Sequence, residues 1–296
     1  MALVATLIAN PSNPVLLPAL GEAACNAVDG AGLYWLADGV ACDIALKDGT
    51  DKAAALATLH AVIGEAAVDV AVQEAESRRK KILIADMDST MIGQECIDEL
   101  AEEAGVGAHV REITARAMNG ELDFEGALTE RVALLKGLDE AVIGKVLAQR
   151  ITFMPGGREL VATMQAEGAH AVLVSGGFTA FTGHVAAALG FDEARANTLL
   201  VDGGRLTGEE ARPILGRAAK VQALEEISAR LGISEAEVIA VGDGANDLGM
   251  LGRAGTGVAL HAKPSVQAEC EIRVNHGDLT ALLFLQGYPR EAFRGA

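Results

Sequence analysis

The sequence is poor in aromatic residues and in positive charge. Aromatic side chains make up 3% of the chain, with one Trp and two Tyr, so its core must be built from aliphatic residues. The 24 Lys and Arg residues are outnumbered by 41 Asp and Glu residues, which leaves a formal charge of −17. This charge repels phosphate backbones and anionic lipid headgroups, which argues against nucleic acid or a membrane surface as a partner.

Paired cysteines and long apolar runs are also missing. The four cysteines are widely scattered with no CxxC pair, so neither a zinc site nor a disulfide framework is indicated, and a reduced, cytoplasmic protein is expected. The apolar start, residues 1–9, lacks a basic region and reaches Asn10 and Pro11 too early for a signal peptide or a membrane span. No later apolar run has spanning length, so no membrane partner is expected.

The chain is long enough for two domains. Residues 1–80 carry the order strand, helix, strand, strand, helix, strand, which is typical of a ferredoxin-like domain, and the charged stretch 74–81 is interpreted as a linker. Residues 81–296 alternate strands and helices, which predicts an α/β fold with a doubly wound, Rossmann-like parallel sheet. Residues 94–150 show helical periodicity alone and are predicted to form a helical cap inserted into this core. Ligands of such a fold bind beyond the carboxyl ends of the strands.

Two acids directly follow a buried apolar strand predicted at residues 81–85. Asp86 can attack phosphorus to form a mixed anhydride, and Asp88 can protonate the leaving oxygen and later deprotonate water. A DxD pair is also common on protein surfaces. Its position after a buried strand favours a catalytic role, because buried acids are costly unless something pairs with them.

Three further polar clusters follow along the chain. Ser175 and Gly176 end a predicted strand and can bring a hydroxyl and main-chain N–H groups to an anion, although Ser-Gly-Gly is also an ordinary turn. Lys220 can supply a cation to phosphoryl oxygens, although a lysine on a helix is usually solvated. Asp243, in the motif GDGAND, offers a hard oxygen ligand that together with Asp86 suits Mg²⁺.

The order DxDxT, strand-end Ser-Gly-Gly, Lys and GDGxND resembles the four motifs of the haloacid dehalogenase superfamily. The residues in and around these motifs resemble its phosphoserine phosphatase family: residues 86–92, residues 175–179, and Glu95, Met118, Phe124 and Arg131 in the helical insertion. The resemblance covers residues 81–296. It implies a magnesium-dependent phosphatase of serine biosynthesis that hydrolyses O-phosphoserine through an aspartyl-phosphate, with Asp86 as nucleophile and Asp88 as general acid and base. It further implies phosphoryl contacts from Ser175, Gly176 and Lys220, Mg²⁺ ligands from Asp86, the Asp88 carbonyl and Asp243, and support from Asn246 and Asp247.

The same resemblance assigns recognition of the amino-acid part of the substrate to the cap. Glu95 would bind the ammonium group and Arg131 the carboxylate, while Met118 and Phe124 would line the cap. The chemistry agrees, because a guanidinium fork suits a carboxylate and a carboxylate suits an ammonium. Without the resemblance, both charges would be interpreted as ordinary helix-surface residues.

Residues 1–80 resemble, by pattern and not by motif, the ACT-like regulatory domains attached to some phosphoserine phosphatases. The alternative is a stability or dimerisation module, so a homodimer is one expectation. Two other functions stay open from the sequence. The core can serve a different small phosphorylated metabolite, as phosphatase or phosphotransferase, or the chain can be an amino-acid-sensing module with a decayed core.

Overall fold

The computed structural model describes residues 2–118 and 121–295, without the side chain of Met118. Its contacts divide the chain into two compact units. The first unit consists of Met1–Lys81, Pro155–Ala169 and Ile272–Ala296, and the second consists of Ile82–Met154 and His170–Glu271. The predicted first domain therefore shares a unit with two segments of the predicted core. Among the described residues, no helix is both long and apolar enough to span a membrane.

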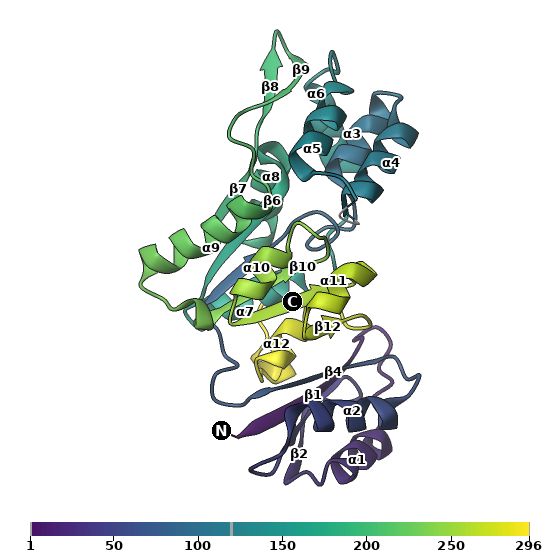
Figure 1. Cartoon of the computed structure of the whole chain (residues 1–296), viewed down its shortest axis with the longest axis vertical. Helices are drawn as coiled ribbons and strands as arrows, with labels where there is room; N and C mark the ends of the chain where they lie inside the picture. Colours follow the sequence, from purple (N-terminus) through teal and green to yellow (C-terminus); the bar gives the residue numbers. More distant parts are fainter. Residues whose placement is uncertain (1, 119–120, 296) are drawn as a thin grey trace. The chain divides into compact units, whose positions relative to one another are not determined.

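The first unit contains an antiparallel sheet with the strand order β2-β3-β1-β4 (Figure 1). Its elements follow the order strand, helix, strand, strand, helix, strand, as predicted for a ferredoxin-like domain. The start of α2 has a local cause, because the Asp51 carboxylate accepts a hydrogen bond from the N–H of Ala54 at 2.7 Å and so caps the helix. The elements are β1 (Leu3–Ala9), α1 (Pro18–Ala27), β2 (Gly32–Ala37), β3 (Ala41–Ala45), α2 (Lys52–Ile63) and β4 (Val68–Glu74).

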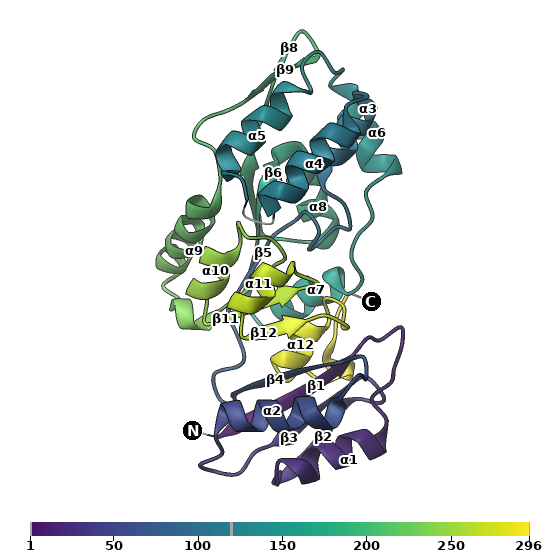
Figure 2. The ribbon, with the colours of Figure 1, turned by 45° about the vertical axis from the view of Figure 1, so that its right-hand side comes forward.

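Both faces of this sheet are covered. Helices α1 and α2 pack on one face, and α12 (Ala281–Leu285) lies against the other (Figure 2). The central strand β1 is therefore buried on both sides: Leu7 belongs to the apolar core with α1 and α2, while Thr6 on the opposite face donates to Asp43 at 2.7 Å. The other elements of this unit are α7 (Gly157–Ala166), β12 (Ile272–Val274) and a 3-10 turn (Arg290–Ala292).

The charged stretch 74–81 is held by contacts within the first unit. Arg78 Nη1 donates to Asp43 Oδ2 at 2.7 Å, and both side chains are largely buried. Lys80 is also buried, and its main-chain N–H donates to Gln286 Oε1 at 3.0 Å. This stretch is therefore an ordered part of the unit. The division into domains of residues 1–80 and 81–296 stays a prediction.

A single carboxylate joins β4 to the segment after β12. Asp69 accepts hydrogen bonds from the main-chain N–H groups of Asn275 at 2.8 Å, His276 at 3.0 Å and Gly277 at 2.8 Å. The carboxylate is buried, so water cannot easily replace it as an acceptor.

We expect Asp69→Ala to lower the free energy of unfolding by about 2–4 kcal/mol, because buried N–H groups would lose a charged acceptor. Urea denaturation followed by circular dichroism measures this change. The matched control is Asp48→Ala, which removes an exposed carboxylate and should change the free energy of unfolding by less than about 1 kcal/mol. Equal effects of the two variants would contradict the prediction.

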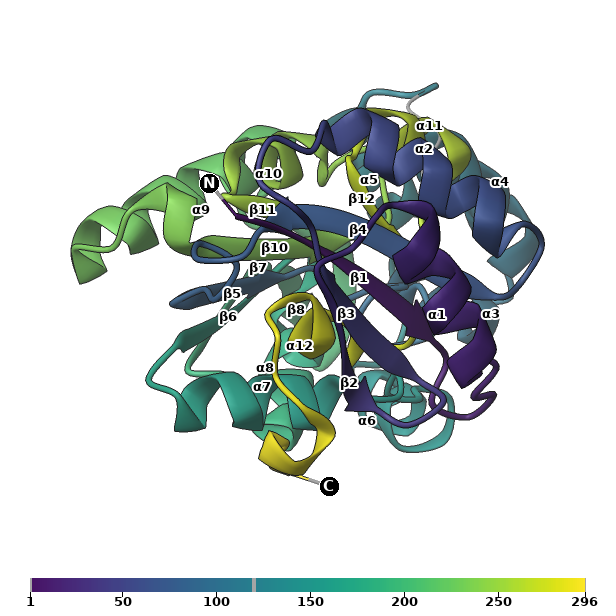
Figure 3. The ribbon, with the colours of Figure 1, turned by 90° about the horizontal axis from the view of Figure 1, so that it is seen from below.

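The second unit contains parallel strands in the order β11-β10-β5-β6-β7. Helices α9 and α10 pack on one side of these strands, and α8 lies on the other (Figure 3). This arrangement confirms the predicted doubly wound α/β fold. The elements are β5 (Ile82–Ala85), β6 (His170–Phe178), α8 (Thr179–Leu189), β7 (Glu193–Asn197), α9 (Arg217–Leu231), a 3-10 turn (Glu235–Glu237), β10 (Val238–Gly242), α10 (Leu248–Arg253), β11 (Thr256–Leu260) and α11 (Pro264–Glu269).

Four helices form the cap, as predicted for residues 94–150. They are α3 (Cys96–Glu103), α4 (Gly107–Met118), α5 (Phe124–Ala133) and α6 (Ala141–Gln149). A hairpin of β8 (Leu199–Asp202) and β9 (Arg205–Glu210) packs against α5. Its anchor is a buried glutamate, Glu210, which accepts a hydrogen bond from Thr129 of α5 at 2.8 Å.

Candidate active site

The carboxyl ends of three neighbouring strands carry the predicted chemistry. Strand β5 lies between β10 and β6, with Ala85 paired to Val241 on one side and to Leu173 on the other. The residues that follow, Asp86, Ser175 and Asp243, therefore come together at one edge of the sheet and line one pocket. All three side chains are buried.

Lys220 lies beneath this pocket, with no exposed side-chain area. Its ammonium nitrogen is 2.7 Å from Asp86 Oδ1 and 2.6 Å from Asp247 Oδ1. The second contact is a hydrogen bond; the first is an ion pair without hydrogen-bond alignment. Burial alone would lower the pKa of this lysine, but the two carboxylates raise it, so the ammonium stays charged.

The acids of the pocket are strongly perturbed. Burial, followed by repulsion from Asp247, raises the pKa of Asp86 to about 7, and Lys220 opposes this shift. Burial and then the charge of Glu95 raise the pKa of Asp88 well above its usual range. Burial and Glu95 also raise the pKa of Asp243. A carboxyl with a raised pKa can hold a proton and donate it, which is the property that a general acid needs.

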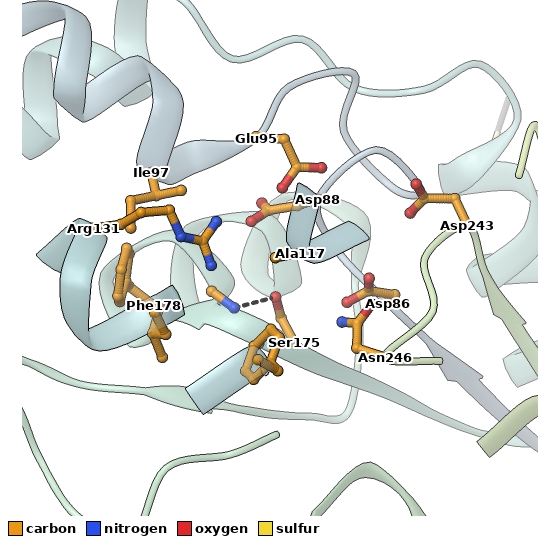
Figure 4. A pocket seen from close by; sticks show the side chains of 14 residues that line it. Asp86, Asp88, Glu95, Ile97, Ala117, Arg131, Ser175, Phe178, Asp243 and Asn246 are labelled. Carbon is orange, nitrogen blue, oxygen red and sulfur yellow. Dashed lines mark hydrogen bonds between the residues drawn. The ribbon is translucent and has the colours of Figure 1, made fainter. Parts of the chain in front are cut away.

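The cap supplies the opposite wall of the pocket. Figure 4 shows Glu95 and Arg131 pointing toward Asp88, while Phe124 also lines the pocket. The Phe124 ring packs so closely that a Cβ at Gly176 would meet its Cζ at 2.6 Å, so the glycine is needed for this contact. Glu95 is held by Ser89, whose hydroxyl donates to its carboxylate at 2.6 Å.

The pocket has an excess of negative charge that a divalent cation would balance. Carboxylate oxygens of Asp86, Asp243 and Asp247 lie within 4.8 Å of one another. Both oxygens of Asp247 already accept hydrogen bonds, from Lys220 and from the N–H of Gly244, whereas Asp86 Oδ1 has only its ion pair with Lys220 and the buried Asp88 Oδ1 accepts no hydrogen bond. Oxygen ligands of this kind fit Mg²⁺. The geometry therefore favours Asp86 and Asp243 as carboxylate ligands, with Asp247 holding the lysine.

Most of the predicted residues converge on this site. The pocket is lined by Asp86, Asp88, Glu95, Phe124, Arg131, Ser175, Gly176, Asp243 and Asn246, while Lys220 and Asp247 lie directly behind it. Met118 ends α4, and its side chain is outside the described part of the structure. No role could be predicted for Ser89, Thr114 or Asn197, because isolated hydroxyl and amide side chains carry no motif of their own. Asn197 holds the Gly176 turn, since its Nδ2 donates to the Gly176 carbonyl at 2.8 Å.

Comparison with known proteins identifies the family of this chain. The family model of haloacid dehalogenase-like hydrolases matches residues 83–252. A phosphoserine phosphatase of Streptomyces coelicolor is 44% identical over 244 residues, which are 82% of this chain and 58% of that protein, so this chain spans little more than half the length of that relative.

Two solved structures are similar as well. A probable phosphoserine phosphatase of Vibrio cholerae superposes with a TM-score of 0.77 at 32% identity, covering 98% of this chain and 88% of that one. A phospho-aspartyl intermediate analogue of phosphoserine phosphatase superposes with a TM-score of 0.67 at 40% identity, covering 70% of this chain and 98% of that one. The chain therefore belongs to the haloacid dehalogenase-like hydrolase family, in the branch formed by the phosphoserine phosphatases.

Proposed function

We propose that this chain hydrolyses O-phosphoserine to serine and phosphate through an aspartyl-phosphate on Asp86. The observation that carries the proposal is the composition of the pocket. One wall holds the residues of phosphoryl transfer, and the cap wall holds one carboxylate, Glu95, and one guanidinium, Arg131. These two charges match the ammonium and the carboxylate of an amino acid.

In the first step, a carboxylate oxygen of Asp86 attacks phosphorus, and the bond from phosphorus to the serine oxygen breaks. Asp88 donates its proton to that leaving oxygen, which departs as the hydroxyl of serine. In the second step, Asp88 accepts a proton from water as the water oxygen attacks phosphorus. The bond to Asp86 then breaks and releases phosphate. The nucleophile and the acid are thus both regenerated.

The phosphoryl group would be held during both steps by Ser175, by the main-chain N–H of Gly176 and by Lys220. The lysine is suited to this role because its charge is maintained by Asp86 and Asp247. A fixed cation that needs no reorganisation stabilises the charge of the transition state better than a mobile one.

Magnesium would be held by Asp86, the Asp88 carbonyl and Asp243, and when bound it neutralises charge between the attacking carboxylate and the phosphoryl oxygens. We expect EDTA to abolish phosphate release and added Mg²⁺ to restore it. Asp243→Asn should raise the Mg²⁺ concentration needed for half-maximal activity at least about tenfold. The control Asp202→Asn, in the exposed hairpin, should leave it unchanged. Full activity in excess EDTA would refute the metal assignment.

Substrate analogues test the proposed function directly. Phosphoethanolamine lacks the carboxylate of phosphoserine, and 3-phosphoglycerate carries a hydroxyl in place of its ammonium group. We expect kcat/KM for phosphoserine to exceed that for either analogue by at least about 10²-fold, because each analogue leaves one of the two charges of the cap, Glu95 or Arg131, without its substrate partner. Comparable kcat/KM values for phosphoserine, phosphoethanolamine and 3-phosphoglycerate would show that the cap does not recognise the amino-acid part of the substrate.

A further inference from the structure

We infer that Thr114 and Asp98 are positioning residues that set the direction in which Arg131 presents its guanidinium group to the substrate. The inference rests on the proposed function, since it explains how carboxylate recognition is built. It concerns three side chains from three different cap helices, Asp98 on α3, Thr114 on α4 and Arg131 on α5.

The three side chains form a chain of hydrogen bonds. Arg131 Nη1 donates to Thr114 Oγ1 at 3.0 Å, and Thr114 Oγ1 donates to Asp98 Oδ1 at 2.6 Å. Arg131 and Thr114 are buried, with 5% and 2% of their areas exposed, so water cannot readily replace either contact. Arg131 lines the pocket whereas Thr114 and Asp98 are not among its lining residues, so these two side chains hold the guanidinium without occupying substrate space.

The direction of each hydrogen bond is fixed by chemistry. A guanidinium can only donate, and a carboxylate can only accept. The single hydroxyl hydrogen of Thr114 must therefore point to Asp98, which turns a lone pair of its oxygen toward Arg131. Without Asp98, the Thr114 hydroxyl could rotate and point its hydrogen at the guanidinium. The positively polarised hydrogens of the two groups would then repel each other.

The remaining donors of Arg131 decide how a carboxylate can bind. Its Nε–H is engaged by the main-chain carbonyl of Ala127, one turn earlier in α5, at 3.0 Å. Binding through Nε and Nη2 together is therefore blocked. A substrate carboxylate can bind only at the outer end of the fork, through Nη2 and the second hydrogen of Nη1. Because Thr114 accepts a hydrogen bond from Nη1, it determines the direction in which the outer N–H groups of the guanidinium point toward a substrate carboxylate.

Thr114→Val tests the inference, because valine keeps the shape and removes both hydrogen bonds. We expect KM for phosphoserine to rise about tenfold with little change in kcat, since a hydrogen bond to a charged group is lost. Activity on phosphoethanolamine, which has no carboxylate to position, should not change. Thr114→Ser restores the hydroxyl and should restore most of the affinity for phosphoserine, whereas a defect in helix packing would not be repaired in this selective way.

Two further variants separate the ways in which the inference can fail. Arg131→Ala should abolish the preference for phosphoserine over phosphoethanolamine. Asp98→Ala should reduce this preference, as Thr114→Val does. If the valine variant does not fold, Asp98→Ala tests the positioning role in its place. If Arg131→Ala abolishes the preference while Thr114→Val and Asp98→Ala keep it, the positioning role is refuted and the proposed function stands. If the wild-type protein shows no such preference, the proposed function fails, and the inference fails with it.

Discussion

Replacing Asp86 by Asn is expected to abolish turnover and leave the fold intact. An amide is too weak a nucleophile to form the acyl-phosphate, so kcat for phosphoserine should fall by about 10⁴-fold or more. The fold should survive because Asn has the same shape, and the main-chain N–H of residue 86 keeps its hydrogen bond to the Val241 carbonyl at 3.0 Å. Phosphate release at saturating phosphoserine measures the effect.

Two controls make this result decisive. Asp202→Asn makes the same substitution in the exposed hairpin turn and should retain full activity. Mass spectrometry must show that residue 86 has not reverted to Asp by deamidation. The wild-type protein, quenched in acid during turnover, should carry phosphate on Asp86. Near-normal activity of a verified Asp86→Asn preparation would rule out the covalent mechanism.

Replacing Lys220 by Met is expected to have the second largest effect, on both catalysis and stability. Methionine fills a similar volume but leaves the buried carboxylates of Asp86 and Asp247 facing each other without their cation. Breaking a buried ion pair from one side typically costs about 3–5 kcal/mol of unfolding free energy. The loss of a fixed donor to the phosphoryl group should lower kcat by about 10²–10³-fold. Urea denaturation and steady-state kinetics measure the two effects separately.

Lys145→Met is the matched control, because Lys145 forms an ion pair with Glu103 but is half exposed. Removing a surface pair should change stability by less than about 1 kcal/mol and leave kcat unchanged. If Lys220→Met loses stability but the folded fraction keeps its normal kcat, the lysine is structural and does not act on the phosphoryl group. If both lysine variants behave alike, burial of the Lys220 pair has no energetic consequence.

Several elements could be predicted from local pattern because their signals are local. Helix α2 begins after Asp51, a capping residue, and ends before Gly64, a residue with positive φ, so both of its ends are marked in the sequence. Strand β5 is four consecutive apolar residues and could be recognised as a fully buried parallel strand. The strand order of the ferredoxin-like sheet follows from connection rules once the element order is known.

Other elements carry too little local signal. Strand β7 has the sequence EARAN, with Glu193 and Arg195 in a span that resembles a polar loop. It becomes a strand because the free edge of β6 offers hydrogen-bond partners, with Val172 paired to Glu193. The short elements α11 and β12 could not be predicted either, since six and three residues are too few to show a period.

The sequence by itself determined the α/β class, the place of the cap and the set of candidate reacting residues, because motif residues at strand ends follow directly from the chain order and the parallel sheet. Only the tertiary structure decided which charges are buried and what pairs with them. Lys220 looked like an ordinary helical lysine until folding placed its ammonium between Asp86 and Asp247. Thr114 had no distinguishing neighbours in the sequence until three helices brought it between Asp98 and Arg131. The physical reason is that desolvation and hydrogen-bond direction depend on atoms far apart in the chain, which no local pattern can specify.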